Sequence, residues 1–158
     1  ILYMSLISGR NPQYLIDEQV HSAPVIHALK LETISTAYML IESGRPTSAE
    51  FMSMTKPIPR HKPDIAVAHA LAAQYMGMKM IYLEAGSGAI HTVPDQMIAA
   101  VERYVELPLI VGGGIRSPEV AVKKIKAGAS FIVTGTVLED ENNHPMISDF
   151  SKAIHQCQ

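Results

Sequence analysis

Five short apolar segments, each followed by a more polar stretch, restrict the possible folds more than any other feature of this sequence. The segments lie at residues 1–8, 31–41, 79–84, 107–111 and 131–134. They are almost wholly apolar, which is typical of strands in a parallel sheet whose two faces are covered. Helices are expected between and after them, at about residues 12–29, 65–76, 94–105, 118–127 and 147–155. The alternation predicts an α/β fold of repeated βα units.

Two architectures share this repeat, an open doubly wound sheet and a (β/α)8 barrel. Five units in 158 residues suit a small open sheet, whereas a barrel usually needs about 250 residues. The sequence starts without methionine, inside the apolar run at residues 1–8, and we expect an N-terminal portion to precede it. Three further units there would complete a barrel, so the residue pattern leaves both architectures open.

Composition narrows the class of protein. Apolar residues make up 47% of the chain, charged residues 18%, and the formal net charge is −2. A disordered chain and a broad basic surface for nucleic acid are therefore disfavoured. The only cysteine is Cys157, which excludes a disulfide scaffold, and no apolar run reaches the roughly 20 residues of a membrane span. We expect a cytoplasmic, globular protein.

Glycines gather around the ends of the last three predicted strands. Those that directly follow a strand are Gly86, Gly88, Gly112, Gly113, Gly114 and Gly135. Glycine lets backbone N–H groups approach an anion closely, and turns between a strand and the next helix bind phosphate. The alternative is that these glycines only form tight turns. Because three successive loops share the pattern, we predict a phosphate site, although neither a Walker loop nor a dinucleotide fingerprint is present.

A second signal is a tyrosine and a carboxylate at the end of the third predicted strand. Strand alternation places Tyr82 and Glu84 on one face, next to the glycine turn. A carboxylate there is able to orient a substrate hydroxyl and accept its proton; the alternative is a structural, salt-bridged glutamate. Arg116 has two interpretations, a phosphate contact or an ion pair with Glu119.

Three sequence blocks resemble a known family. They are YLEAGSGA at residues 82–89, GGGIR at 112–116 and TGT at 134–136. With this spacing they resemble the geranylgeranylglyceryl phosphate synthase family, and residues 4–12 and 55–59 resemble its bacterial and archaeal group. The resemblance covers essentially the whole chain. It implies a modified (β/α)8 TIM barrel, of which residues 1–158 would form the C-terminal portion of a single domain, about the last five βα units.

The resemblance also implies an activity. Such a prenyltransferase joins the C3 hydroxyl of sn-glycerol 1-phosphate to a geranylgeranyl or similar polyprenyl diphosphate, which makes the ether bond of ether lipids. Glu84 would align the hydroxyl and accept its proton, with Tyr82 beside it. The residues that would hold the glycerol phosphate are Tyr82, Leu83, Glu84, Ala85, Gly86, Ser87 and Gly88, and those that would hold its phosphate are Gly113, Gly114, Gly135 and Thr136.

The family resemblance further implies Mg²⁺, which would neutralise the leaving diphosphate. The strands that carry the family's metal-binding aspartate have no counterpart in this sequence, so no metal ligand is assigned and the ligands are expected in the missing N-terminal part. The chain alone is therefore expected to be inactive. Since the family forms dimers and hexamers, a homo-oligomer is also expected.

Two other functions remain as alternatives. One is another phosphate-binding TIM-barrel enzyme, a sugar-phosphate isomerase or lyase. A Schiff-base lyase needs a lysine at the carboxyl end of a strand, whereas Lys30 and Lys79 precede their strands. The other is a catalytically inactive fragment that binds phosphate.

Overall fold

A parallel sheet of five strands forms the centre of the computed structural model, which describes residues 1–157. The strands are β1 (Leu2–Leu6), β2 (Ile34–Leu40), β3 (Met80–Glu84), β4 (Leu109–Gly112) and β5 (Phe131–Val133). The α-helices are α1 (Glu18–Ala28), α2 (Ser48–Ser53), α3 (Pro63–Tyr75), α4 (Asp95–Tyr104), α5 (Pro118–Lys126) and α6 (Met146–His155). A π-helical turn, η1 (Gln13–Asp17), precedes α1, and two short 3-10 helices, η2 (Thr136–Leu138) and η3 (Glu141–Asn143), follow β5.

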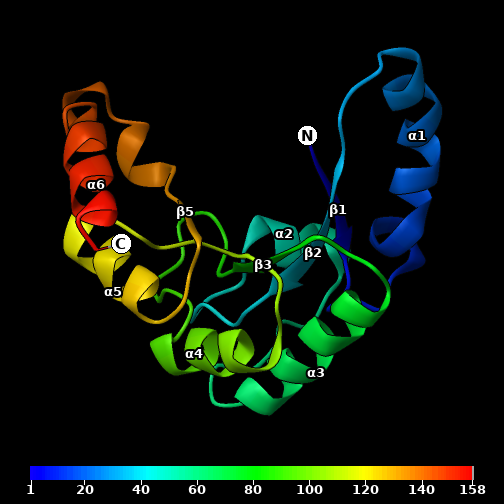
Figure 1. The fold of residues 1–158 in the computed structure, drawn as a ribbon, viewed down its shortest axis with the longest axis horizontal. Helices are drawn as coiled ribbons and strands as arrows, with labels where there is room; N and C mark the ends of the chain where they lie inside the picture. The colour runs from blue at the N-terminus through cyan, green and yellow to red at the C-terminus, as the bar shows by residue number, and fades with distance from the viewer. Residues whose placement is uncertain (158) are drawn as a thin grey trace.

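The order of the strands distinguishes between the two architectures. Neighbours in the sheet are neighbours in sequence, β1-β2-β3-β4-β5, and every pair is parallel. A doubly wound sheet would reverse its order at a switch point, and no reversal occurs here. In Figure 1 helices α3, α4 and α5 follow one another around the outside of the strands. The α/β prediction is confirmed, and the arrangement is an arc of a βα barrel.

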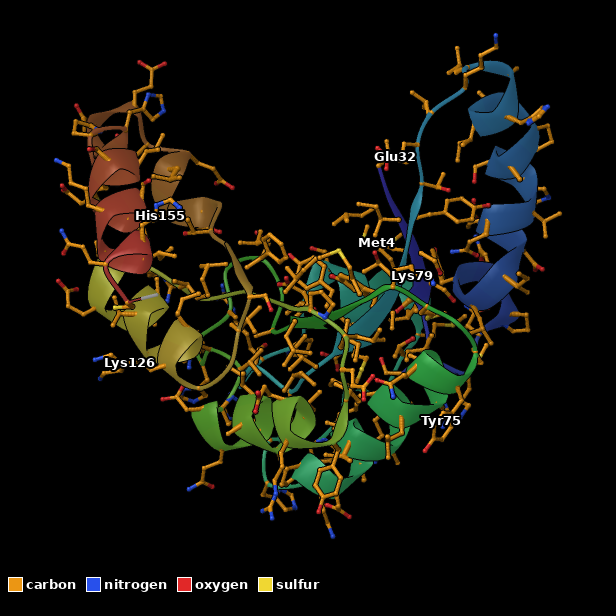
Figure 2. The ribbon with its side chains drawn as sticks, in the orientation of Figure 1. Met4, Glu32, Tyr75, Lys79, Lys126 and His155 are labelled. Carbon is orange, nitrogen blue, oxygen red and sulfur yellow. The ribbon has the colours of Figure 1, made fainter. Side chains whose placement is uncertain are left out.

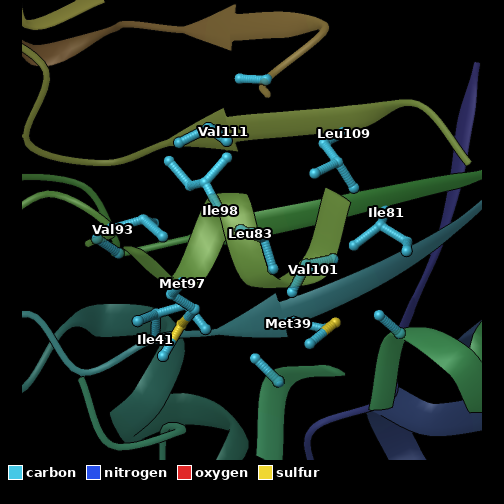
Figure 3. Packing of buried hydrophobic residues seen from close by; sticks show 14 of the residues in the cluster. Met39, Ile41, Ile81, Leu83, Val93, Met97, Ile98, Val101, Leu109 and Val111 are labelled. Carbon is cyan, nitrogen blue, oxygen red and sulfur yellow. The ribbon is translucent and has the colours of Figure 1, made fainter. Parts of the chain in front are cut away.

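The two faces of the sheet are packed differently. On the outer face, Met39, Ile81 and Leu83 are fully buried against helices that include α4, whose Met97 and Ile98 are also fully buried (Figure 3). Each such side chain contributes about 1.5–3 kcal/mol to folding. The inner face carries a smaller cluster of Met80, Tyr82 and Ile110, with Ile34 and Tyr38 packed against it. Strand alternation thus directs the Tyr82 and Glu84 side chains inward.

Some local expectations need correction. No helix was expected between residues 42 and 63, but this connection contains α2. The first strand is shorter than residues 1–8, and the first helix begins with a π-helical turn. Ser117 caps α5, since its side chain accepts a hydrogen bond from the Val120 N–H, and this helix begins where it was expected.

The arc is open between its first and last strands. Each of these edge strands leaves apolar side chains exposed, including Met4 on β1 and Phe131 on β5. Figure 1 shows α1 and α6 as two arms on either side of the opening, and α1 contains no buried residue. A helix that crosses a bilayer needs about 20 apolar residues, and none in the described part of the chain has that length and apolarity.

Candidate glycerol phosphate site

A cavity of about 410 Å³ lies where the carboxyl ends of β3, β4 and β5 meet. All of the residues predicted for the site line it except Leu83 and Ala85. The predicted residues that line it are Tyr82, Glu84, Gly86, Ser87, Gly88, Gly113, Gly114, Gly135 and Thr136. The loops after three successive parallel strands therefore meet around a single space.

Leu83 and Ala85 lie in the outer hydrophobic core instead. Leu83 is fully buried and Ala85 is 1% exposed. Alternation along β3 explains this, because every second residue of a strand points to the opposite face. The Ala85 N–H donates to the Gly112 carbonyl at 3.1 Å, so this residue connects two of the loops through its backbone.

Glu84 is the buried carboxylate of the cavity. Its Oε1 accepts a hydrogen bond of 2.6 Å from the Gly86 N–H. Burial raises the pKa of Glu84, although hydrogen bonds from the Tyr82 hydroxyl and from the Gly86 backbone partly oppose this. Among residues 1–157, no cation lies within ion-pair distance of Glu84. The carboxylate is therefore held in place without a partner that would neutralise it, and it is a stronger proton acceptor than an exposed glutamate.

Two aromatic rings stand beside this carboxylate. Tyr38 and Tyr82 pack edge to face, with ring centroids 5.2 Å apart and planes at 79°. Burial, followed by the charge of Glu84, raises the pKa of both hydroxyls. Tyr82 therefore stays a hydrogen-bond donor at neutral pH, directed at Glu84.

The β4 turn approaches the carboxylate closely because it lacks side chains. A methyl group on Gly113 would lie 2.7 Å from Glu84 Oε1 and 2.6 Å from the Gly86 nitrogen, and its φ is +85°. A methyl group on Gly112 would also overlap Glu84 and the Tyr82 hydroxyl. A side chain at Gly113 would thus overlap backbone as well as Glu84, whereas one at Gly112 would displace the ends of the Glu84 and Tyr82 side chains.

Hydroxyl groups connect the β3 and β5 turns. Ser87 Oγ and Thr136 Oγ1 are 3.3 Å apart across the cavity mouth. Thr134 Oγ1 donates to the Ile115 carbonyl at 2.8 Å, which ties β5 to the β4 turn. Backbone N–H groups and hydroxyls from three turns thus surround one space, an arrangement suited to an anion.

Several lining residues were not assigned to the site from the sequence. Tyr38 comes from β2, Ser48 and Ala49 begin α2, and Glu139 follows η2. A capping box was the signal that would have revealed α2, because Thr47 and Glu50 have the T-x-x-E spacing. In the structure the Thr47 side chain accepts from the Glu50 N–H at 3.3 Å.

Arg116 lines the cavity and donates to the Ala89 carbonyl at 3.0 Å. The alternative partner, Glu119, is instead associated with Ser117, whose hydrogen bond lowers the pKa of the Glu119 carboxyl. The structure therefore favours the interpretation in which Arg116 faces the cavity.

Residues 1–154 match the model of the PcrB family. The chain belongs to this family. Relatives named geranylgeranylglyceryl phosphate synthase occur in Chitinophaga pinensis, with 46% identity over 98% of this chain and 61% of the relative, and in Pyrococcus furiosus, with 50% identity over 88% and 55%. This PcrB chain thus spans less than two thirds of the length of these relatives.

Solved structures agree with the assignment to the PcrB family. The (S)-3-O-geranylgeranylglyceryl phosphate synthase of Thermoplasma acidophilum, solved in complex with its substrate sn-glycerol-1-phosphate, superposes with a TM-score of 0.92. It is 36% identical to this chain, and the match covers 98% of the chain and 62% of that structure. The synthase of Thermoplasma volcanium matches with a TM-score of 0.90. The expected family and its barrel fold are confirmed.

Proposed function

We propose that this chain holds the glycerol phosphate and the proton acceptor of a prenyltransferase that forms the ether bond of ether lipids. The substrates would be sn-glycerol 1-phosphate and a geranylgeranyl or similar polyprenyl diphosphate. The observation that carries the proposal is the position of Glu84 inside a ring of three glycine turns, where it is buried and, among residues 1–157, forms no ion pair. The proposal is also supported by the Thermoplasma acidophilum structure, which was solved in complex with its substrate sn-glycerol-1-phosphate.

The phosphate would lie between the turns at residues 86–88, 112–114 and 135–136. Their amides and the Ser87 and Thr136 hydroxyls are donors, and donors that are fixed before binding cost little to reorganise. The Gly86 N–H is already used by Glu84, so the remaining amides of these turns would serve the phosphate. The glycerol would then extend toward Glu84 and Tyr82.

The reaction follows from this placement. The C3 hydroxyl oxygen forms a bond to the first carbon of the prenyl chain, while the bond from that carbon to the diphosphate breaks. The hydroxyl proton passes to the Glu84 carboxylate, and the diphosphate leaves with the electron pair of the broken bond. Because burial raises the pKa of Glu84, the proton transfer is closer to balanced at neutral pH, which favours general-base catalysis.

Magnesium does not fit the residues described here. In residues 1–157, no cluster of three or more His, Cys, Asp or Glu side chains is able to hold a metal ion. The cavity carries only two carboxylates, Glu84 and Glu139. No step is therefore assigned to Mg²⁺ in this chain, and Mg²⁺ ligands outside it stay a prediction, as do the cytoplasmic location, the homo-oligomer and the absence of a nucleic acid partner.

The open arc supports a proposal about the domain. Residues 1–158 would be the C-terminal portion of one (β/α)8 barrel, with further βα units pairing with the free edges of β1 and β5. Unpaired edges of a parallel sheet expose N–H and C=O groups that another strand satisfies. Pairing at both edges would also cover Met4 and Phe131, which are 42% and 52% exposed.

Titration calorimetry tests the proposed substrate. The chain should bind sn-glycerol 1-phosphate at least about tenfold more tightly than the 3-phosphate enantiomer, a difference of about 1.4 kcal/mol. Equal affinity for the two enantiomers and for inorganic phosphate would favour the inactive phosphate-binding fragment. Tighter binding of a sugar phosphate would favour the isomerase or lyase.

A substitution separates binding from chemistry. Glu84→Gln keeps an oxygen for the Gly86 N–H but is unable to accept a proton. In an enzyme assembled with the remaining barrel units, it should lower turnover by about 10²–10⁴-fold and leave the dissociation constant for sn-glycerol 1-phosphate within a few fold. Full turnover by this variant would exclude Glu84 as the base.

A further inference from the structure

The loop between β3 and α4, residues 85–94, is held by cations in an unusual way. Four of its carbonyl oxygens each accept a hydrogen bond from a different basic side chain. The pairs are Arg45 Nη2 with Gly88 O at 2.6 Å, Arg116 Nη2 with Ala89 O at 3.0 Å, Arg60 Nη1 with Thr92 O at 2.6 Å, and Lys124 Nζ with Val93 O at 2.7 Å. This β3–α4 loop carries the glycine turn of the proposed phosphate site.

The four cations reach the loop from both sides. Arg45 and Arg60 lie in the connection between β2 and α3, whereas Arg116 follows β4 and Lys124 is on α5. A backbone hydrogen bond of 3.0 Å from the His91 N–H to the Ser43 carbonyl adds to the β2 side. The loop is therefore fastened to the units that precede and follow it.

Lys124 is the most unusual of the four. It is 5% exposed, and its ammonium also contacts Asp95 Oδ1 at 2.5 Å. A lysine is rarely buried without compensating partners, and here a carboxylate and a carbonyl at the start of α4 supply them. The contact fixes the point at which the loop enters α4.

A carbonyl oxygen that turned into the cavity would repel a bound dianion, and Gly88, whose carbonyl Arg45 holds, is one of the residues that line the cavity. Hydrogen bonds from charged donors are stronger than those between neutral groups. Arg45, Arg60 and Lys124 do not line the cavity, so each holds its loop carbonyl from outside it. Arg116 itself lines the cavity. A loop fixed in this way loses less conformational entropy when an anion binds.

We propose that Arg45, Arg60 and Lys124 are positioning residues, which hold the carbonyls of the β3–α4 loop so that the turn at Gly86–Gly88 keeps its anion-binding shape. This inference rests on the proposed function, since it assigns the loop to the phosphate of sn-glycerol 1-phosphate. None of the three residues is among those that line the cavity, so they would act through the loop.

Hydrogen–deuterium exchange with and without ligand tests the proposal on the whole chain. Arg45→Met removes an exposed side chain and its contact with Gly88, and Lys124→Met removes the buried contact. Without ligand, amides of residues 86–93 should exchange at least about tenfold faster in both variants, while those of β3 and β4 keep their rates. The dissociation constant for sn-glycerol 1-phosphate should rise about tenfold.

Lys126→Met is the matched control, because Lys126 is an exposed cation on the same helix and points outward in Figure 2. It should change neither exchange nor affinity. Arg45→Lys, which keeps the charge and a donor, should restore most of the protection lost in Arg45→Met.

Three results overturn the positioning role. They are unchanged exchange in Arg45→Met, faster exchange without loss of affinity, and an equal loss of affinity in Lys126→Met, which would indicate a general effect of net charge. If the unsubstituted chain fails to bind sn-glycerol 1-phosphate, the proposed function fails, and faster exchange in the two variants would still support the role of these cations in holding the loop.

Discussion

The Glu84 carboxylate accepts two hydrogen bonds. One comes from the Gly86 N–H, and the other comes from the Tyr82 hydroxyl. Strand alternation was enough to predict that Tyr82 and Glu84 face the same side. The bond from the Gly86 N–H was not predictable, because it depends on a positive φ of +97° at Gly86 and on how tightly the β4 turn packs against it.

The raised pKa of Glu84 predicts a pH dependence of stability. The folded state retains the proton at pH values where the unfolded chain has released it, so stability is highest at low pH and falls as pH rises through the raised pKa. The Glu84→Gln variant should not show this decrease in stability with rising pH. Its free energy of unfolding should exceed that of the unsubstituted chain at about pH 8, and the difference should shrink toward about pH 4.

Urea unfolding between about pH 4 and about pH 8 measures this difference in the free energy of unfolding. The Tyr82→Phe variant keeps Glu84 and should retain a fall with increasing pH. Parallel curves for Glu84→Gln and the unsubstituted chain would show that Glu84 has an ordinary pKa in the folded state.

Gly113→Ala should destabilise the chain more than Gly77→Ala. Both glycines have positive φ, +85° and +81°, but a methyl group on Gly113 would overlap backbone and Glu84, whereas Gly77 has open space around it. We expect a cost of about 1–2 kcal/mol at Gly77 from the left-handed backbone, and about 2–4 kcal/mol at Gly113, where overpacking adds to it. Denaturant midpoints compare the two, and equal costs would mean that the β4 turn yields without strain.

At the scale of elements, the helix ends were predictable where capping chemistry is local. Serine followed by proline is a local signal for the start of a helix, and α5 begins at Pro118 with Ser117 as its cap. The start of α1 was less predictable, because neither its cap nor its first turn follows the standard pattern. Helix α2 was missed because proline and polar residues surround its six residues, although its capping box was visible.

Ser117→Ala should cost about 1 kcal/mol, since it leaves an N–H group of the first turn of α5 without its acceptor. The substitution should also return the pKa of Glu119 toward its ordinary value, because the Ser117 hydrogen bond is the main cause of the lowering. Urea unfolding and NMR titration measure the two effects.

Ser117→Asp is the control for this prediction, because aspartate is an equally good cap. It should recover most of the lost stability. A cost for Ser117→Ala that the aspartate variant shares would point to packing, rather than capping, as the role of Ser117.

At the scale of the molecule, the alternation of βα units correctly predicted the α/β class, but it did not decide between a barrel and an open sheet. That choice depends on which face the helices cover. Apolar strands are expected in a barrel and in a doubly wound sheet alike, because both architectures bury the two faces of each strand. Here the inner cluster is small and the outer one large, as expected when the helices cover one face of the sheet only.

The open edges predict self-association. Met4 and Phe131 expose apolar surface on two unpaired edge strands, and such edges recruit other strands. In sedimentation velocity, the mean mass of the chain should therefore rise with concentration in the micromolar range. The double variant Met4→Lys with Phe131→Lys should remain closer to the monomer, because charge on an edge strand opposes pairing.

Tyr75→Lys serves as the control, because Tyr75 is 80% exposed on α3, away from the opening (Figure 2). It should associate as the unsubstituted chain does. If the unsubstituted chain stayed monomeric at all concentrations, the edges of β1 and β5 would be protected without a partner.

The residues that line the main cavity run from Tyr38 to Glu139, and none comes from β1 or α1. If the proposed function holds, recognition of the phosphorylated alcohol is encoded by the single stretch of sequence from Tyr38 to Glu139. If this stretch were grafted between other βα units of matching curvature, it would keep the proposed preference for a phosphorylated alcohol. The units on either side of it would then determine what that alcohol is joined to.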